Sequence, residues 1–549
     1  MPAPAESLPL DVRAAAAAAP RHFAALLGNA LAQAACTVAL ALGARAAIDS
    51  GPGIATVSVL AVAALGGAWL RGRERVDGEA LGQRFVHDVR LRLFDHLLAV
   101  PTRELSERPK GGALVRFVGD LQAIKSWISR GLAQLIVALP MLAASVAVLG
   151  WIDPALGILA AALVVAGAVG AALLAGPLAQ ANRELRNRRG QLARFVTEMM
   201  GAVPSVQAHG KESREQRRLD ARGAHVIDAA CARAVLVGRA RSLVQLLGSG
   251  ALLAVLVIGA ARLEAGEMVA ALAVVAWLTT PIRDLGRVFE YWQAAKVARE
   301  RISAFFRWPQ LPGAQGGRRL RRPGGQLRYD GVVACAGAAP LDLEVDAGSV
   351  TVFTGPNGCG KSSLLAVTAR LQAPVAGRVR LGGQDLAQVR NRDLRQHIAM
   401  VGPDLPLIRG SVRRNASYRS RGMTPEAFRT LMRRCRLEHL VENGGDSPAR
   451  IAEAGLNLSS GERQRLALAR ALWPEPSVLL LDEIDNHLDT ESLAVLRSVI
   501  AAFPGTVIVV THDPRLLDAA ERVVELGADG SIVSDRRQPA SDVAWEGAA

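Results

Sequence analysis

Long apolar segments dominate the first part of the chain. Six of them run over residues 22–47, 54–70, 131–150, 155–178, 243–261 and 268–285. Each is close to the roughly 20 residues that a helix needs to cross the hydrocarbon core of a bilayer. We therefore predict six membrane-spanning helices, although each segment taken alone also fits a buried core helix.

Basic residues distinguish the two sides of the predicted spans. The long segments between the second and third spans and between the fourth and fifth are rich in arginine, whereas the short turns at 49–53, 151–154 and 262–267 carry almost none. Because cytoplasmic loops hold an excess of Lys and Arg, we place the long segments and both termini in the cytoplasm. This alternation argues against reading all six segments as a soluble core.

The arginine-rich segments have helical patterning of their own. The apolar positions at helical spacing in the first of them are Val86, Val89, Leu93 and Leu97. Residues 192–200 show a similar pattern, so we expect the spans to continue into the cytoplasm as helices joined by turns near 102–107 and 201–210. Such extensions would reach a cytoplasmic domain, and the alternative is a solvated, charged helix hairpin.

A few charged residues lie in or near the predicted spans. They are Arg45, Arg283, Asp284, Arg287 and Glu290. Charge inside a membrane usually marks a substrate or ion pathway, which makes these residues candidates for lining a central cavity. The alternative is that they sit at the membrane interfaces with their charged ends in water.

The composition changes after the last span. A stretch rich in Pro, Gly and Arg reads as a linker, and beyond it apolar runs such as 478–481 alternate with helical patterns. This pattern is typical of an α/β domain with buried parallel strands. We expect a transmembrane domain with its cytoplasmic helix extensions at 1–310, a linker at 311–326 and the α/β domain at 327–549, with a frayed polar tail from Ser531.

The net charge of +15 is explained by this arrangement. Much of it lies in the segments that flank the spans on the cytoplasmic side, so we predict contact with membrane lipids and no binding of nucleic acid. The five cysteines have neither metal-binding spacing nor a disulfide framework. A multi-pass protein of the cytoplasmic membrane, with the α/β domain on the cytoplasmic side, is the predicted location.

One motif defines the chemistry of the α/β domain. It is Gly355-Pro356-Asn357-Gly358-Cys359-Gly360-Lys361-Ser362-Ser363, which follows an apolar, β-branched run and precedes a predicted helix. In this setting the spacing predicts a phosphate-binding loop, with Lys361 on the β- and γ-phosphates and Ser362 on Mg²⁺. ATP and Mg²⁺ are the expected cofactors. The predicted fold class is therefore an all-α six-helix transmembrane domain followed by an α/β P-loop NTPase domain.

Two later strand ends carry further candidate residues. Asp482 and Glu483 follow the apolar run at 478–481, and His512 follows the run at 507–510. The carboxyl ends of strands are where open α/β sheets bind ligands. Asp482 suits Mg²⁺, Glu483 suits a general base that polarises the attacking water, and His512 suits contact with a γ-phosphate. Each signal is weak alone and becomes strong after a phosphate loop.

The segment Leu458-Ser459-Ser460-Gly461-Glu462-Arg463-Gln464-Arg465 resembles the signature sequence of ATP-binding cassette (ABC) proteins. With six preceding spans, the chain resembles a type IV exporter-like ABC half-transporter. The resemblance implies that two cassettes close head to tail around two ATPs, and it assigns the roles given above to Lys361, Ser362, Asp482, Glu483 and His512. It further implies that Ser459, Ser460 and Gly461 contact the ATP of the opposite cassette, that Asp489 lies in the loop that communicates across the dimer, and that Glu453 contacts the membrane domain.

Three departures from the family pattern stand out. Pro403 takes the place of a glutamine, so neither a side-chain oxygen nor an N–H is available there, although Asp404 or water can substitute. The signature reads Ser-Ser-Gly-Glu, which puts the charge of Glu462 near a triphosphate. No aromatic that could stack on adenine occurs at 332–339, and Tyr329 lies too early, within a predicted strand. We expect ATP binding and hydrolysis, with weaker base affinity or slower turnover than in relatives.

The predicted function is an ATP-hydrolysing transporter that moves a lipid, peptide, drug or similar amphipath across the cytoplasmic membrane by alternating access. Export is favoured. The alternatives are import, for instance of a siderophore, and an ATP-binding membrane regulator with weak turnover. We expect a homodimer because this chain keeps Glu483 and His512, and a heterodimer with a second half-transporter is the alternative. The transported substrate is not specified by the sequence.

Overall fold

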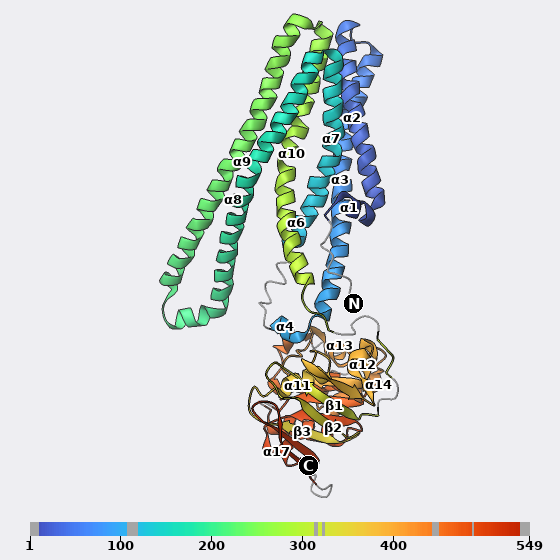
Figure 1. The fold of residues 1–549 in the computed structure, drawn as a ribbon, viewed down its shortest axis with the longest axis vertical. Helices are drawn as coiled ribbons and strands as arrows, with labels where there is room; N and C mark the ends of the chain where they lie inside the picture. The colour runs from blue at the N-terminus through green and yellow to red at the C-terminus, as the bar shows by residue number, and fades with distance from the viewer. Residues whose placement is uncertain are drawn as a thin grey trace. The chain divides into compact units, whose positions relative to one another are not determined.

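A computed structural model describes residues 10–106, 119–311, 317–320, 324–441, 450–485 and 488–538, leaving out the side chains of 103 and 279–286. The chain forms two compact units (Figure 1). The helical unit comprises Met1–His96 and Pro109–Trp308, and the α/β unit comprises Leu97–Arg108 and Pro309–Ala549. The boundaries predicted at 310 and 326 stay predictions.

The helical unit consists of long helices that run side by side (Figure 1). Their bounds are α1 Val12–Ala18, α2 Pro20–Asp49, α3 Ile54–Ala99, α6 Leu121–Ser126, the π-helix η2 Trp127–Leu132, α7 Ala133–Ile152, α8 Pro154–Ala208, α9 Glu212–Arg262 and α10 Ala265–Phe306. Within the described residues, five helical stretches are long and apolar enough to cross a membrane, and the apolar part of α10 is the shorter Ala265–Leu278. The count of six spans thus stays a prediction.

The predicted cytoplasmic extensions are helical. α3 continues well beyond its apolar part to Ala99, and α8 continues to Ala208. The turn predicted at 201–210 is wrong, because it is too long. Helix α8 includes Gly201 and Pro204, and only residues 209–211 separate it from α9. Glycine and proline are turn signals, but packing of α8 along α9 outweighs them here.

Helix α3 approaches the π-helix η2 closely. A Cβ atom on Gly78 would lie 2.6 Å from the carbonyl oxygen of Ser129, and one on Gly82 would lie 2.8 Å from Ser129 Cβ. The indole N–H of Trp127 in η2 donates to the carbonyl of Leu10 (3.1 Å), and its ring centroid lies 4.8 Å from that of Trp292. A side chain at Gly78 or Gly82 of α3 would therefore clash with Ser129 of η2.

Polar side chains join α2 to α3 inside the helical unit. The buried Asn29 donates to the carbonyl of Leu70 (2.8 Å), and the buried Gln33 donates to Asn29 (2.8 Å) and Glu74 (3.0 Å). A buried amide without such partners would cost about 1–3 kcal/mol. These residues therefore fix how the two helices face each other.

Two of the charged residues considered as cavity candidates are ion-paired. Arg45 lies 3.0 Å from Glu267 and 3.3 Å from Asp49, which places it at the ends of helices. Glu290 lies 3.6 Å from Arg233. The side chains of Arg283 and Asp284 lie outside the described residues.

The α/β unit contains two main sheets. The antiparallel sheet has the order β2-β1-β4-β5, and the other has the order β12-β11-β3-β10-β9-β6, in which only β12 is antiparallel to its neighbour. The strands are β1 Leu327–Val333, β2 Leu341–Val345, β3 Val350–Thr354, β4 Ala376–Leu381, β5 Gln384–Asp385, β6 Ile398–Val401, β9 Val478–Asp482, β10 Thr506–Val510, β11 Arg522–Leu526 and β12 Ile532–Arg537, with a separate pair β7 Gly410–Ser411 and β8 Arg450–Ile451. The parallel strands at 478–481 and 507–510 are thus confirmed.

Helices and short turns complete this unit. The α-helices are α4 Thr102–Ser106, α11 Lys361–Thr368, α12 Asn391–His397, α13 Val412–Ala416, α14 Pro425–Arg434, α15 Ser460–Leu472, α16 Thr490–Ala501 and α17 Pro514–Leu517. The 3-10 turns are η3 Leu386–Gln388, η4 Glu438–Leu440 and η5 Glu453–Gly455. α4 occupies the predicted turn at 102–107, and its Thr102 N–H donates to the carbonyl of Leu371 (3.2 Å), just after α11.

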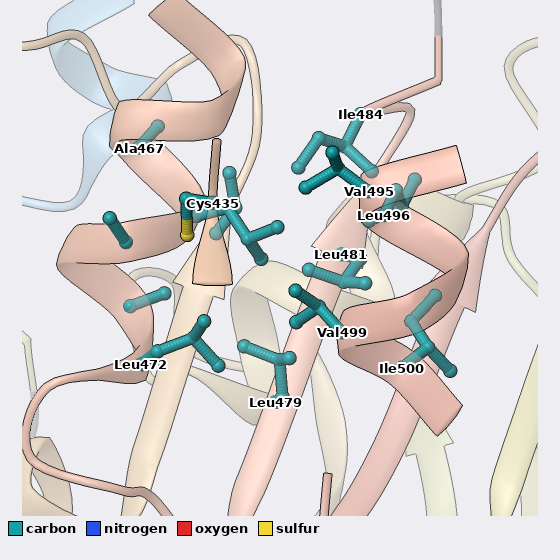
Figure 2. Close-up of a cluster of buried hydrophobic side chains, with 14 of the residues drawn as sticks. Cys435, Ala467, Leu472, Leu479, Leu481, Ile484, Val495, Leu496, Val499 and Ile500 are labelled. Atoms are coloured by element: carbon teal, nitrogen blue, oxygen red, sulfur yellow. The ribbon is translucent and has the colours of Figure 1, made fainter. Parts of the chain in front are cut away.

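Strand β9 is buried on both faces. Leu479 and Leu481 point into a cluster with residues of α15 and α16 (Figure 2), whereas Val478 and Leu480 belong to a second cluster on the opposite face. Successive side chains of a strand alternate between faces, so a continuous apolar run is what a doubly covered strand requires.

The C-terminal tail is partly structured, contrary to the prediction of fraying from Ser531. β12 pairs with β11, and Arg522 forms two short contacts with Asp535 across the pair (2.8 and 2.7 Å). β12 is largely exposed, so its sequence lacks the apolar alternation that would have identified a strand. Residues 539–549 lie outside the described part.

Candidate functional site

The predicted site residues lie at one edge of the large sheet. In the register of the parallel strands, Phe353 of β3 lies beside Val510 of β10, which lies beside Asp482 of β9. On the far side of β9, Val401 of β6 pairs with Leu481. The phosphate loop, Glu483, His512 and Asp404 each follow one of these strands, so the carboxyl ends of the strands bring them to a common edge.

The phosphate loop depends on glycine at two positions. Gly355 has a φ of +141°, and a Cβ there would lie 2.3 Å from the carbonyl oxygen of Leu526. Gly360 has a φ of +101° and is the N-cap of α11, where no side chain accepts from the first turn. The N–H groups of that turn are therefore available to an anion at the loop.

Lys361 is folded into the loop. Its side chain is almost fully buried, and its ammonium group donates to the carbonyls of Gly355 (2.6 Å) and Pro356 (2.9 Å). Cys359 Sγ lies 3.9 Å from the same ammonium group. The ammonium group of Lys361 is thus held within the turn formed by the predicted phosphate-binding residues.

A buried carboxylate lies beside this loop. Ser362 donates to Asp482 at 2.9 Å, and Asp482 is only 4% exposed. Burial raises the pKa of Asp482 to about 6, and the charges of Glu483 and Asp404 act in the same direction. A hydroxyl and carboxylates that repel one another are oxygen donors that fit a hard divalent cation such as Mg²⁺.

The side-chain oxygens near Asp482 do not form a complete metal site by themselves. Among the residues that the structure describes, no group of three or more His, Cys, Asp or Glu has metal-binding geometry. Mg²⁺ usually keeps several waters and is held by one or two carboxylates together with substrate phosphates, so the donors present match that mode of binding.

Glu483 and His512 follow neighbouring strands. Glu483 has a φ of +46°, an unusual backbone conformation for a glutamate, and its N–H donates to the carbonyl of Val510 (3.0 Å). Thr511, which is buried, donates to Asp485 (2.5 Å) and accepts from the N–H of Asp513 (2.8 Å). These bonds fix the backbone on both sides of the exposed His512. The Thr511–Asp485 contact is not visible in the sequence.

The signature residues begin helix α15 as predicted. Ser459 is its N-cap and bonds reciprocally with Glu462. A Cβ on Gly461 would lie 2.6 Å from Ser492 Oγ and 3.8 Å from Asp489 Oδ1, so Gly461 and Asp489 are brought together. The side chain of Asp489 itself caps α16 by accepting from Ser492 N–H (2.8 Å).

A cavity of about 510 Å³ connects the signature helix with the strand ends. Ser460, Asp482 and Glu483 line it together with Pro403. The described hydrogen bonds of Ser459, in contrast, are with Glu462 and Arg463, and none reaches the phosphate loop. The exposed Glu453 lies in the turn η5 that precedes α15.

The structure shows the surroundings of two departures from the family pattern, the lack of an aromatic for adenine and the proline at position 403. Tyr329 is 1% exposed, its hydroxyl lies 2.9 Å from that of Thr368, and burial raises its pKa, so it belongs to the core of the unit. The described residues 334–339, after β1, carry only small side chains. Beside the exposed Pro403, Asp404 lies close enough to influence the pKa of Asp482.

Comparison with known proteins extends these observations. The family model described as ABC transporter matches residues 338–486, and that described as ABC transporter transmembrane region matches residues 22–279. The ATP-dependent lipid A-core flippase of Ralstonia nicotianae is 31% identical over 64% of this chain and 62% of the flippase. The flippase of the same name from Thiobacillus denitrificans is 27% identical over 81% of this chain and 79% of the flippase.

A solved structure shares the fold. The structure of a bacterial Atm1-family ABC exporter with ATP bound matches with a TM-score of 0.82 and 22% identity, over 94% of this chain and 95% of that one. The match to the Ralstonia flippase spans less than two thirds of the length of that relative. The matched ABC region implies ATP binding. With a transmembrane region and a nucleotide-binding region matched on one polypeptide, the chain belongs to the ABC transporter family.

Proposed function

We propose that this chain is one half of a dimeric, ATP-hydrolysing transporter that moves an amphipathic substrate across the cytoplasmic membrane. The observation that carries the proposal is the Ser362–Asp482 pair beside the phosphate loop, on a polypeptide that also has long apolar helices. The first feature suits phosphoryl chemistry and the second suits a membrane pathway.

The phosphate loop would bind the triphosphate. The backbone N–H groups from Gly358 to Ser363 and the start of α11 face an anion in this type of loop. Lys361 would exchange its bonds to the carbonyls of Gly355 and Pro356 for phosphate oxygens. The remaining loop residues, Asn357, Cys359 and Gly360, would shape the turn.

Mg²⁺ would be held by Ser362 and Asp482. When bound, the cation would neutralise charge on the phosphates. Asp404 follows β6, next to Asp482, and we assign it the supporting role that Pro403 cannot fill. Its charge would keep water oriented toward the cation site.

Glu483 is the proposed general base, and His512 the proposed contact to the γ-phosphate. Glu483 follows Asp482 directly, so a water between the two strand ends would lie within its reach. The bonds of Thr511 to Asp485 and Asp513 would hold His512 at the adjacent strand end.

The site would be completed by a second copy of the chain. Ser459, Ser460 and Gly461, with Asp489 beside them, would contact the nucleotide of the opposite half, because Ser459 has no described bond to its own phosphate loop. A homodimer is proposed since each copy carries Glu483 and His512. Six spans, with the nucleotide-binding domain on the cytoplasmic side, complete the proposed arrangement.

Export of a lipid-like amphipath is the direction and substrate class we propose. Support comes from the lipid A-core flippases and from the likeness in fold to an Atm1-family exporter. Import and a purely regulatory role are the competing outcomes of the test.

The test uses the full-length protein in proteoliposomes with a panel of fluorescent lipids, peptides and drugs. We expect ATPase activity that at least one amphipath stimulates, ATP-dependent movement of that amphipath, and loss of both in Glu483→Gln. Movement in the opposite direction would indicate import. ATP binding without turnover above that of Glu483→Gln would indicate a regulator and overturn the proposal.

A further inference from the structure

The last residue of the four-residue signature, Glu462, is held by two partners. One carboxylate oxygen accepts from the N–H of Ser459 (2.8 Å), and Ser459 Oγ accepts from the N–H of Glu462 (3.1 Å). The other oxygen lies 2.7 Å from Nε2 of His439 in the turn η4. The carboxylate of Glu462 therefore lies over the first turn of α15.

This charge matters because of where it lies. Helix N-termini attract anions through their free N–H groups and partial positive charge. A carboxylate within the first turn stabilises the helix itself but opposes the approach of a second anion. A signature that ends in glutamate is thus less suited to a triphosphate unless a hydrogen-bond donor holds the carboxylate and offsets part of its charge.

His439 is the side chain that contacts this carboxylate. Among the described residues it forms the only ion pair of Glu462, and its hydrogen bond is the main reason that the pKa of Glu462 is lowered. The nearby arginines have another partner, since Arg436 and Arg465 both lie against Glu491 at the start of α16. Within the described part of the chain, His439 is the one side chain that bonds to the carboxylate of Glu462.

We propose that His439 is a positioning residue of the signature, which holds the carboxylate of Glu462 through a hydrogen bond so that the N-terminus of α15 can accept the triphosphate bound by the opposite half. This inference rests on the proposed dimeric function. It accounts for how this chain uses a signature with glutamate in the last position. His439 acts through Glu462 and need not touch the nucleotide.

The experiment compares wild type, His439→Ala, Glu462→Gln and the double variant in lipid nanodiscs. We expect His439→Ala to raise the KM for ATP about two- to fivefold, the range for a partly exposed pair, with little change in kcat. In the Glu462→Gln background the same substitution should leave KM unchanged, because no carboxylate remains for His439 to hold. Glu438→Ala, which alters an exposed neighbour on the same turn, is the matched control and should behave as wild type.

Binding measurements keep this inference separate from hydrolysis. In the Glu483→Gln background, His439→Ala should weaken ATP binding by a similar factor, and Glu462→Gln should abolish the difference. An equal loss of affinity from His439→Ala with and without the Glu462→Gln substitution would show a merely structural role and overturn the inference. An unchanged KM and affinity in His439→Ala would overturn it as well. If the wild type binds ATP with the expected pattern but never turns over, the proposed function fails and the inference stands.

Discussion

The two ends of the proposed ATP site are built differently. The phosphate-loop end combines residues from distant parts of the chain, since Ser362 bonds to Asp482 and a Cβ on Gly355 would meet Leu526. At the signature end, Ser459 bonds to Glu462 on the same turn, and Glu462 and Gly461 also meet the more distant His439 and Ser492. Lys361 and Asp482 at the first end are buried beside the sheet, whereas Ser459 and Ser460 at the signature end are exposed. This difference is what a site divided between two copies of the chain requires.

The largest expected effect is at the phosphate-loop end. Asp482→Asn keeps the shape of the side chain and its contact with Ser362 but removes the charge that would hold Mg²⁺. We predict that kcat for ATP falls about a hundredfold or more. Asp404→Asn is the matched control and should reduce kcat only a fewfold, because Asp404 lies in the exposed segment after β6. Equal losses in both variants would show that the cation site is assigned wrongly.

A smaller effect is expected where the two helix starts meet. Gly461→Ala would place a Cβ 2.6 Å from Ser492 Oγ, so the α/β unit should lose about 1–3 kcal/mol of unfolding free energy. Adding Ser492→Ala removes the clashing atom and should restore most of that stability. Thermal or chemical unfolding of the variants measures the change.

ATPase measurements on the same variants test whether Gly461 also contacts the nucleotide. If Gly461 is also needed for close approach of the nucleotide of the opposite half, the Gly461→Ala, Ser492→Ala double variant should be stable and still have a raised KM. Full recovery of both stability and KM would mean that Gly461 serves only the packing of α15 against α16.

The smallest effect is expected at the Arg522–Asp535 pair, where β11 lies beside the start of β3 and away from the phosphate loop. Asp535→Ala removes the partner of Arg522 and should cost about 1 kcal/mol of unfolding free energy without altering ATPase activity. Because Arg522 lowers the pKa of Asp535, this stabilisation is present above the ordinary pKa of the carboxyl group and is lost as the pH falls through the lowered value. The difference between wild type and variant should therefore shrink in acid.

The local parts of this architecture are predictable from the sequence. The phosphate loop, the buried strand before Asp482 and the helix that begins at Ser460 each depend on consecutive residues, and all three have the predicted secondary structure. The roles given to their side chains stay predictions, because no bound nucleotide tests them.

The features that the sequence does not predict depend on contacts between residues far apart in the chain. His439 lies 23 positions before Glu462, and only the packing of η4 against α15 reveals the pair. Gln33 meets Glu74 for the same reason, across two helices. The exposed strand β12 and the uninterrupted end of α8 were missed because their local residues favour irregular structure, and pairing with β11 and packing along α9 override that preference.

The most direct measurement mixes two inactive chains. Glu483→Gln removes the proposed base, and Ser460→Glu places a charge that an exposed helix start tolerates but that would repel the triphosphate of the opposite half. Each variant alone should be inactive, and their mixed dimers should retain one intact site built from the unaltered parts of both chains. Co-expression should therefore restore up to about a quarter of the wild-type ATPase rate, since half of the dimers are mixed and each has one working site of two. No activity in the mixture, with both chains folded and paired, would contradict a site shared between two copies.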